Sequence, residues 1–512
     1  MKYNEILKEG NKVLNHEGAL AFRMSPEMEL YTAAVTSTLS GKFYESPKQF
    51  VDRISALVGR VDAEFVAKLA VYTRTVMNLR SIPLLLDVEL ARHHSGDNLV
   101  ARAVAKTVLR ADEIAELLMC YQWRNPVPEA QVKKLGKLSR QIQNGLKESF
   151  NSFDEYQFAK YNRDAAVKLR DALFLVHPKA KDEAQQALFD KIVSGTLETP
   201  YTWETQLSAL GQQKFDSDEE KKAAVKALWE ELLDSGKFGY MALLRNLRNI
   251  LQAGVDDAHV DALCKRLSDP DQVARSKQLP FRFLSAYREL QNVDSVHASK
   301  VLSALEAAVK ASVVNLEGFG ADTHVLVAAD VSGSMYHPVS PKSTVMNFDI
   351  AILLSQILRS KCESVISGMF GDTWKVYNLP NENVLANTID MYRHEGEVGY
   401  STNGYKVIDY LVNGKIRMDK VMIFTDCQMW DSESGKSWCA DKHIKDSWHR
   451  YKAMFPEAKL YLFDLSGYGD APLDLAEKDV YLIAGWSEKV FDVLKAVDNG
   501  SDALAEIGKV EL

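Results

Sequence analysis

Two stretches of the chain differ in how apolar and polar residues alternate. From about residue 322 onward, short apolar runs alternate with longer amphipathic runs. The short runs predict strands at 323–329, 364–370, 420–425, 459–465 and 480–484. The longer runs predict helices at roughly 346–360, 403–413, 437–455 and 487–497. Strands separated by helices form parallel βαβ units, so this part predicts an α/β doubly wound sheet.

Residues 1 to about 315 have mainly helical periodicity. One clear apolar stripe, with the spacing of a single helix face, consists of Leu243, Leu244, Leu247, Ile250 and Leu251. Many helices with few strand signals favour a stacked helical array, although no repeat of fixed period is evident. Two glycines near 315–322 mark the join, so we predict one domain at 1–318 and a second at 319–512.

Composition is that of a soluble globular protein, and the charges are unevenly distributed. No apolar run is long enough to cross a membrane, and five scattered cysteines favour a reducing cytoplasm over a disulfide framework. The net charge of −8 divides into −9 for residues 321–512 and +1 for residues 1–320. Within residues 1–320, the segment 133–179 holds ten Lys and Arg against five Asp and Glu. We therefore expect an acidic domain beside one with a basic patch, and no membrane partner.

Polar residues follow the first predicted strand of the α/β part. Asp330, Ser332 and Ser334 alternate directly after the apolar run 323–329. They should emerge at the carboxyl end of a strand, where open α/β sheets bind ligands. One carboxylate and two hydroxyls suit a hard cation that keeps some waters, so Mg²⁺ or another divalent cation is the expected occupant. This pattern resembles the metal-ion-dependent adhesion site of a von Willebrand factor A domain.

The resemblance extends to two further elements. Asp426 ends the strand 420–425, and Thr402 lies in a turn-rich loop between the two strands. By resemblance, Ser332, Ser334 and Thr402 supply hydroxyl ligands, Asp330 and Asp426 balance charge through bound waters, and a partner's acidic group fills the sixth position. The threonine usually follows Gly-Gly and here follows Tyr400-Ser401. The alternative is that these residues are ordinary helix caps and turn residues.

Three basic stretches of the helical part are candidate RNA contacts. The first is a predicted helix over 161–177, whose core residues include Ala165 and Ala166. Along one flank of this helix, Arg163, Arg170 and His177 recur every seven residues. Pro178 should end this helix, and Lys168 and Lys179 add further charge. The second stretch presents Arg245 and Arg248 on the polar side of the apolar helix, and the third contains Lys133, Lys137 and Arg140. Such cations can bind phosphates, but a solvated helix face or pairing with nearby acids explains them equally.

Taken together, the motifs resemble the TROVE module of the Ro autoantigen family, in particular its bacterial Ro-sixty-related members. The matching segments are 169–179, which ends in His177-Pro-Lys179, then 241–248, then Gln278-Leu-Pro-Phe-Arg282-Phe, followed by an A domain that opens with Asp-Val-Ser-Gly-Ser. The resemblance implies an α-helical repeat, HEAT-like ring plus the A domain. It also implies that Arg170, His177 and Lys179 belong to a surface that contacts small non-coding Y RNA.

The same resemblance implies the role of the protein. Family members take single-stranded 3′ ends of structured or defective RNA into a central hole and work with exoribonucleases in RNA quality control, maturation or decay. No Walker loop, nucleophile elbow, HExxH or paired catalytic carboxylates occur, so we expect a non-catalytic, monomeric, cytoplasmic ribonucleoprotein component. The alternatives are a metal-dependent protein-interaction scaffold without RNA, and a metal-dependent nuclease.

Overall fold

The computed structural model describes residues 11–37, 42–126, 138–162, 166–312, 318–339, 343–434, 443–487 and 489–512. It divides into two compact units, residues 1–50 with 229–504 and residues 51–228 with 505–512. The predicted domain boundary at 318/319 lies within the first of these units. The amino-terminal segment and several helices of the helical part pack with the α/β part instead. Among the described residues, no helix is long and apolar enough to cross a membrane.

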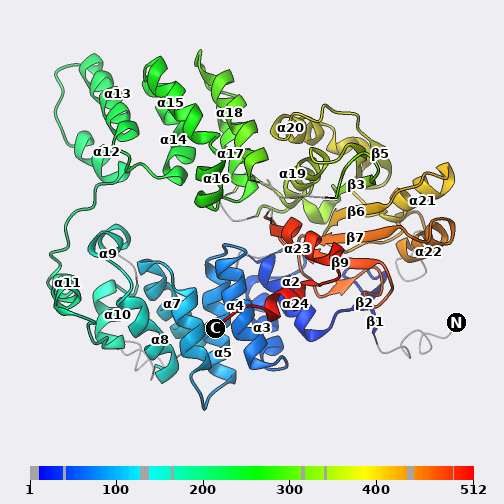
Figure 1. Ribbon diagram of the computed structural model, residues 1–512, viewed down its shortest axis with the longest axis horizontal. Coiled ribbons are helices and arrows are strands. Elements are labelled where there is room, and N and C mark those ends of the chain that lie inside the picture. Colours follow the sequence, from blue (N-terminus) through cyan, green and yellow to red (C-terminus); the bar gives the residue numbers. More distant parts are fainter. Residues whose placement is uncertain are drawn as a thin grey trace. The chain divides into compact units, whose positions relative to one another are not determined.

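The α/β part of the first unit contains a six-stranded sheet of order β5-β4-β3-β6-β7-β9 (Figure 1). The strands are β3 His324–Asp330, β4 Ser364–Phe370, β5 Trp374–Val376, β6 Lys420–Thr425, β7 Lys459–Asp464 and β9 Val480–Ala484. All neighbours are parallel except β5, which pairs antiparallel with β4. The five predicted strands and the α/β class are thus confirmed, and the edge strand β5 is added.

Helices cover both faces of this sheet, as a doubly wound fold requires. They are α19 Asn347–Arg359, α20 Leu385–Arg393, α21 Tyr405–Gly414, α22 Ile444–Met454 and α23 Lys489–Asp498, with 3₁₀ turns at Gly333–Met335, Glu395–Val398 and Ser432–Ser434. The last helix, α24 Ala503–Gly508, contains the division between the two units and belongs mainly to the second. Alternate strand residues such as Leu326 and Ile423 pack against α21 and α22 in one apolar core. On the opposite face Phe463 contacts Phe491 of α23. Successive side chains of these strands point to opposite faces of the sheet, and both faces are buried. The strands therefore appear in the sequence as continuous apolar runs.

A short hairpin from the amino terminus joins the α/β part. Its strands are β1 Lys12–Leu14 and β2 Leu20–Arg23, followed by α2 Pro26–Val35. Strand β2 pairs antiparallel with β8 Asp470–Ala471, which gives a second sheet of order β1-β2-β8. The turn uses the left-handed conformation of Gly18 and a hydrogen bond from Ala19 N to Asn15 Oδ1 (2.8 Å). Strands of three and four residues are too short to produce a readable period, so the sequence did not predict this hairpin.

Helices α14 to α18 complete the first unit. They are α14 Tyr240–Ala253, α15 Asp257–Leu267, α16 Pro270–Ser276, α17 Pro280–Leu290 and α18 Ala298–Ala311. The predicted stripe of α14 is buried, as expected. Two polar contacts join these helices to the α/β part. Arg288 of α17 donates to the buried Asp349 of α19, and Glu306 of α18 accepts from Val384, Leu385 and Ala386 at the start of α20.

The second unit is helical throughout its described residues. It contains α3 Pro47–Val58, α4 Ala63–Thr75, α5 Ser81–His93, α6 Leu99–Thr107, α7 Ala111–Arg124, α8 Arg140–Phe150, α9 Glu155–Tyr161, α10 Leu169–Val176, α11 Glu183–Ser194 and α12 Trp203–Gly211, and α13 Asp218–Asp234 leads into the first unit. Side-chain caps fix several helix starts, for example Asp62 before α4 and Asp182 before α11. The expected helical part is confirmed as a helix array.

Candidate metal centre and basic helical surfaces

The predicted metal ligands come together at the switch point of the six-stranded sheet. Strand β4 lies on one side of β3, and strand β6 lies on the other. The chain thus leaves β3 toward one edge of the sheet and later continues from β6 toward the opposite edge, which makes the position between β3 and β6 the switch point. Asp330 is the last residue of β3, and Asp426 directly follows β6. A crevice forms at this position in open α/β sheets because the loops leave the strands in opposite directions. The fold therefore places two carboxylates beside each other where ligands bind.

Hydrogen bonds orient the loop after β3. The fully buried Asp330 accepts from Ser332 N at Oδ1 (2.9 Å) and from Thr425 Oγ1 at Oδ2 (2.6 Å). The hydroxyl oxygens of Ser332 and Ser334 lie 3.3 Å apart. Both serines are buried as well. This geometry directs two hydroxyl oxygens and one carboxylate toward the same small volume.

Asp426 is the second carboxylate, and one of its oxygens has no partner. Its Oδ1 accepts from Gln428 N (3.0 Å), whereas Oδ2 is buried without a hydrogen bond within the described part of the chain. Burial raises the pKa of Asp426, and the charge of Asp330 raises it further. Burial likewise raises the pKa of Asp330, against hydrogen bonds from Thr425 and Ser332. Two buried carboxylates and an orphaned oxygen are the surroundings that a divalent cation compensates.

The Thr402 loop approaches this point despite its unusual sequence. Gly333 N donates to Tyr400 O (2.8 Å), and Ser401 N donates to Asp372 Oδ1 (2.8 Å). Thr402 is buried, and its carbonyl accepts from Trp430 N (3.3 Å), beyond Asp426. Gly399, with φ of 73°, supplies the left-handed residue that this loop needs. Tyr400 and Ser401 thus replace the usual glycines, and backbone hydrogen bonds tie this loop to Gly333 after β3 and to Trp430 after β6.

The amino-terminal hairpin lies over the same end of the sheet, which the sequence did not suggest. The hydroxyl of Tyr44 donates to Glu17 and also has a hydrogen bond with the side chain of Ser334. Burial, then the Glu17 hydrogen bond and the charge of Asp426, raise the pKa of Tyr44, while the Ser334 bond lowers it. Residues more than 280 positions apart are therefore neighbours at the candidate metal centre.

The described RNA candidates of the second unit are solvent-exposed. They are Arg140, Lys168, Arg170, His177 and Lys179, while Lys133, Lys137 and Arg163 lie outside the described residues. The predicted helix over 161–177 is wrong, because α9 ends at Tyr161 and α10 begins at Leu169. Ala166, expected in the core, is exposed. Of the predicted flank, Arg170 lies on α10 and His177 at its end, whereas Arg163 lies outside the described residues.

The end of α10 matches the prediction. His177 ends the helix in the left-handed conformation, with φ of 49°, directly before Pro178. Arg170 lies 5.7 Å from the ring of Phe174, an exposed aromatic side chain on the next turn. An exposed cation and aromatic pair of this kind can contact both phosphate and base.

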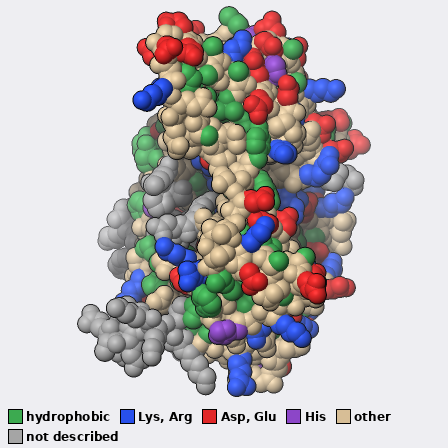
Figure 2. Space-filling model, turned by 90° about the vertical axis from the view of Figure 1, so that its left-hand side faces the viewer, with side chains coloured by type: hydrophobic (Ala, Val, Ile, Leu, Met, Phe, Trp, Pro, Cys, Tyr) green, Lys and Arg blue, Asp and Glu red, His purple; other side chains and the backbone are tan. Residues whose placement is uncertain are grey.

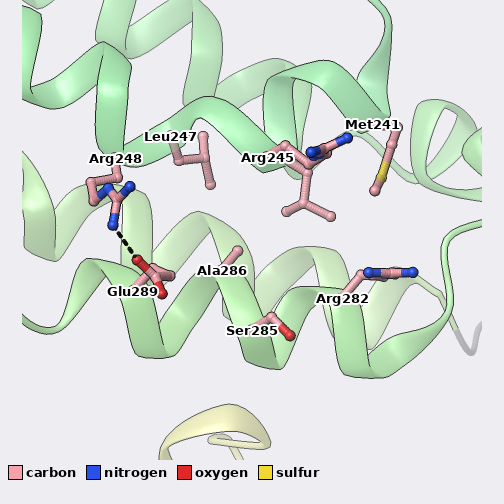
Figure 3. A pocket seen from close by; sticks show the side chains of 9 residues that line it. Met241, Arg245, Leu247, Arg248, Arg282, Ser285, Ala286 and Glu289 are labelled. Atoms are coloured by element: carbon pink, nitrogen blue, oxygen red, sulfur yellow. Dashed lines mark hydrogen bonds and ion pairs between the residues drawn. The ribbon is translucent and has the colours of Figure 1, made fainter. Parts of the chain in front are cut away.

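The second basic stretch lines a pocket of about 270 Å³ between α14 and α17. At one end Arg248 pairs with Glu289 at 2.7 Å (Figure 3). At the other end Arg245 of α14 and Arg282 of α17 lie near each other (Figure 3). Neither of these two makes an ion pair with a carboxylate of the described residues. Acid pairing, one explanation left open for both arginines, thus applies to Arg248 and not to Arg245.

Arg282 is a candidate that sequence reasoning did not include as a site residue. Although the residue is exposed, desolvation of its guanidinium and the charge of Arg245 lower the pKa of Arg282. Its position in the resembling segment 278–283 was visible, but its proximity to Arg245 depends on how α14 and α17 pack. Elsewhere, the face drawn in Figure 2 shows Lys and Arg scattered among Asp and Glu rather than gathered in one patch.

Comparison with known proteins supports the resemblance. The TROVE domain model matches residues 28–224 and 196–316, more than half of the chain. The chain is 23% identical over 529 residues to "RNA-binding protein RO60" of Deinococcus radiodurans, with 96% of each protein covered. It is 24% identical over 352 residues to "Telomerase protein component 1" of Rattus norvegicus, which covers 53% of this chain and 13% of that protein.

The fold has a solved counterpart. The crystal structure of the Deinococcus radiodurans RO (RSR) protein aligns with a TM-score of 0.59 at 21% identity, over 93% of this chain and 100% of that one. At this identity the likeness concerns the fold. Because the family model matches most of the helical part, and the motifs of segments 169–179 and 241–248 lie within it, the chain belongs to the TROVE-domain family.

Proposed function

We propose that this protein binds RNA through its helical part and does not cleave it. The observation that carries the proposal is the convergence of Arg245 and Arg282 from two helices, with no carboxylate partner among the described residues. Two guanidiniums that repel each other are stabilised by an anion between them, and phosphate fits their planar donors. Relatives named as RNA-binding proteins make a nucleic-acid phosphate the natural anion.

Single-stranded RNA suits this pocket better than a duplex. The space beside the two arginines is lined by apolar atoms of Met241, Leu244 and Ala286, which can contact a base while the guanidiniums hold the backbone. In the proposed function, single-stranded 3′ ends of structured or defective RNA bind here. The exposed Arg140, Lys168, Arg170, His177 and Lys179 contact a folded, Y-type small RNA.

Holding RNA without cleaving it implies a partner enzyme. We propose that the protein presents RNA 3′ ends to an exoribonuclease in maturation or decay, and that it does so as a cytoplasmic monomer. The pocket residues Arg245, Arg282, Ser285 and Glu289 do not form a set that activates water, because the one carboxylate is paired with Arg248.

The α/β part has a separate role in the proposal, as a Mg²⁺ site. Asp330, Ser332, Ser334, Thr402 and Asp426 fit a hard divalent cation, since they offer oxygen donors alone and Asp426 keeps a buried oxygen with no partner in the described part of the chain. A bound cation would supply charge balance and a rigid junction for the three loops. Hydroxyl ligands with an acidic occupant of the last position suit gripping rather than hydrolysis.

The test replaces both arginines, Arg245→Gln with Arg282→Gln, and measures affinity for a single-stranded oligonucleotide across salt concentrations. Each phosphate contact with single-stranded nucleic acid contributes about 0.7 to the slope of log K against log salt. Two lost contacts should flatten that slope by roughly 1.4. The double change Lys265→Gln with Arg275→Gln removes the same charge from exposed positions on α15 and α16 and should leave the slope nearly unchanged.

Three outcomes would contradict the proposal. Equal slopes for the wild type and the Arg245/Arg282 variant would show that these residues do not bind phosphate. No RNA affinity in the wild type would favour the protein-interaction scaffold instead. Mg²⁺-dependent shortening of the oligonucleotide by the pure protein would identify a nuclease.

A further inference from the structure

The turn of the amino-terminal hairpin is fixed beside Asp426. Asn15 Nδ2 donates to Met429 O (2.9 Å), and His16 N donates to Gln428 Oε1 (2.8 Å). Gln428 is fully buried and lies two residues after Asp426, and its own backbone N–H donates to that carboxylate. The hairpin turn is therefore bonded to the loop that carries the second carboxylate of the candidate metal centre.

An aromatic cluster fixes the next residue of the turn, Glu17. The ring of His16 stacks on Tyr44 with centroids 4.8 Å apart and an angle of 3°. Tyr468 meets both rings edge-on, at 5.1 Å from His16 and 5.4 Å from Tyr44. The Tyr44 hydroxyl, positioned by these contacts, donates to the half-buried Glu17 carboxylate. Glu17 is thereby held in one place instead of extending into solvent.

Tyr44 links Glu17 to the candidate metal centre. The single proton of the Tyr44 hydroxyl goes to Glu17, and the same hydroxyl also has a hydrogen bond with Ser334. Ser334 in turn lies beside the hydroxyl of Ser332 and has a hydrogen bond with Asp426. The carboxylate of Glu17 is thus two hydrogen bonds from Ser334, which adjoins Asp426.

We propose that Glu17 supplies the acidic group for the last coordination position of the metal, directly or through one water, and that Tyr44 positions it. This inference rests on the proposed Mg²⁺ site. It replaces the expectation that a partner protein fills this position. The metal then fastens the amino-terminal hairpin to the α/β part, and an acidic residue of another protein would have to displace Glu17 to bind.

Titration calorimetry with Mg²⁺ alone tests the proposal on the full chain. Glu17→Gln should weaken Mg²⁺ binding by about tenfold or more, within the 10–100-fold range for supporting ligands. Tyr44→Phe should weaken it less, in the same direction. Glu27→Gln is the matched control, because Glu27 lies at the start of α2 and has no side-chain contact with the site within the described residues. Asp330→Ala marks complete loss of the site.

Acetate provides a second readout. If Glu17→Gln opens the last position, added acetate should occupy it and restore part of the lost Mg²⁺ affinity, whereas acetate should have little effect on the wild type. Equal strengthening of both proteins by acetate would overturn the proposal, because the position would then be open in the wild type.

The results separate failure of this inference from failure of the metal site. Mg²⁺ binding that is lost in Asp330→Ala but unchanged in Glu17→Gln would reject Glu17 and retain the site. No Mg²⁺ binding in the wild type would reject both. Circular dichroism of each variant shows that the fold is intact, and Glu17, half-buried in a turn, tolerates an amide of the same size.

Discussion

Asp87 should make the stability of the second unit depend on pH. It lies on α5 with no exposed surface, and its Oδ2 accepts from Thr107 of α6. Its Oδ1 has no hydrogen-bond partner within the described ranges. Burial raises the pKa of Asp87 to about 8, against the lowering effect of the Thr107 hydrogen bond. The folded protein therefore holds this carboxyl in its neutral form at neutral pH.

The sign of the effect follows from proton linkage. The unfolded chain ionises Asp87 near the ordinary aspartate pKa of 3.8, whereas in the folded chain the pKa is about 8. Between these values unfolding releases a proton, so the free energy of unfolding should fall with rising pH, by about 1.4 kcal/mol per pH unit. The contribution is complete below pH 4 and is lost as pH rises through 8.

Asp87→Asn removes this dependence while it preserves shape and the acceptor for Thr107. The free energy of unfolding of the variant minus that of the wild type should increase by about 1.4 kcal/mol per pH unit from pH 5 to pH 8. The assay equilibrates both proteins in urea at each pH, pulse-labels them under one common condition, and follows deuterium in α5 peptides by mass spectrometry. This readout reports the second unit separately from the first.

Asp190→Asn is the control, because this acid is exposed on the surface of α11. Its free-energy difference from the wild type should be nearly constant with pH. A constant difference for Asp87→Asn as well would refute the reasoning, since it would mean that Asp87 is ionised in the folded protein and has its charge balanced.

Two further predictions concern binding. Arg170→Glu and His177→Ser should weaken affinity for a folded small RNA more than for a short single strand, because both residues are exposed at α10 of the second unit, whereas the proposed single-strand site, the Arg245/Arg282 pocket, belongs to the first unit. Filter binding with both RNA types measures this, and equal losses would contradict it. Asp330→Ala should remove bound Mg²⁺, measured by metal analysis, and leave RNA affinity within about twofold, because the α/β part is acidic and repels phosphate; a loss of RNA binding with an intact fold would mean that the metal contacts phosphate.

Much of the α/β part could be predicted from the sequence. Its five main strands and helices α19, α21, α22 and α23 have strong, local apolar periods, because both faces of the sheet are covered, whereas helix α20 was not predicted. The positions of Asp330 and Asp426 follow from the strand ends, and those of Ser332 and Ser334 from their spacing. The helix end at His177 also follows from a local cause, the proline after it.

The tertiary structure decided what depends on residues far apart in the chain. The period alone could not show that the helix at 161–177 is interrupted, or that one oxygen of the buried Asp87 lacks a partner among the described residues. Nor could it show that Arg248 pairs with Glu289 while Arg245 lies near Arg282. It also could not show that Tyr44 has hydrogen bonds with both Glu17 and Ser334. A side-chain period reports which face of an element is buried, whereas the identity of the neighbour on that face is set by how separate elements pack.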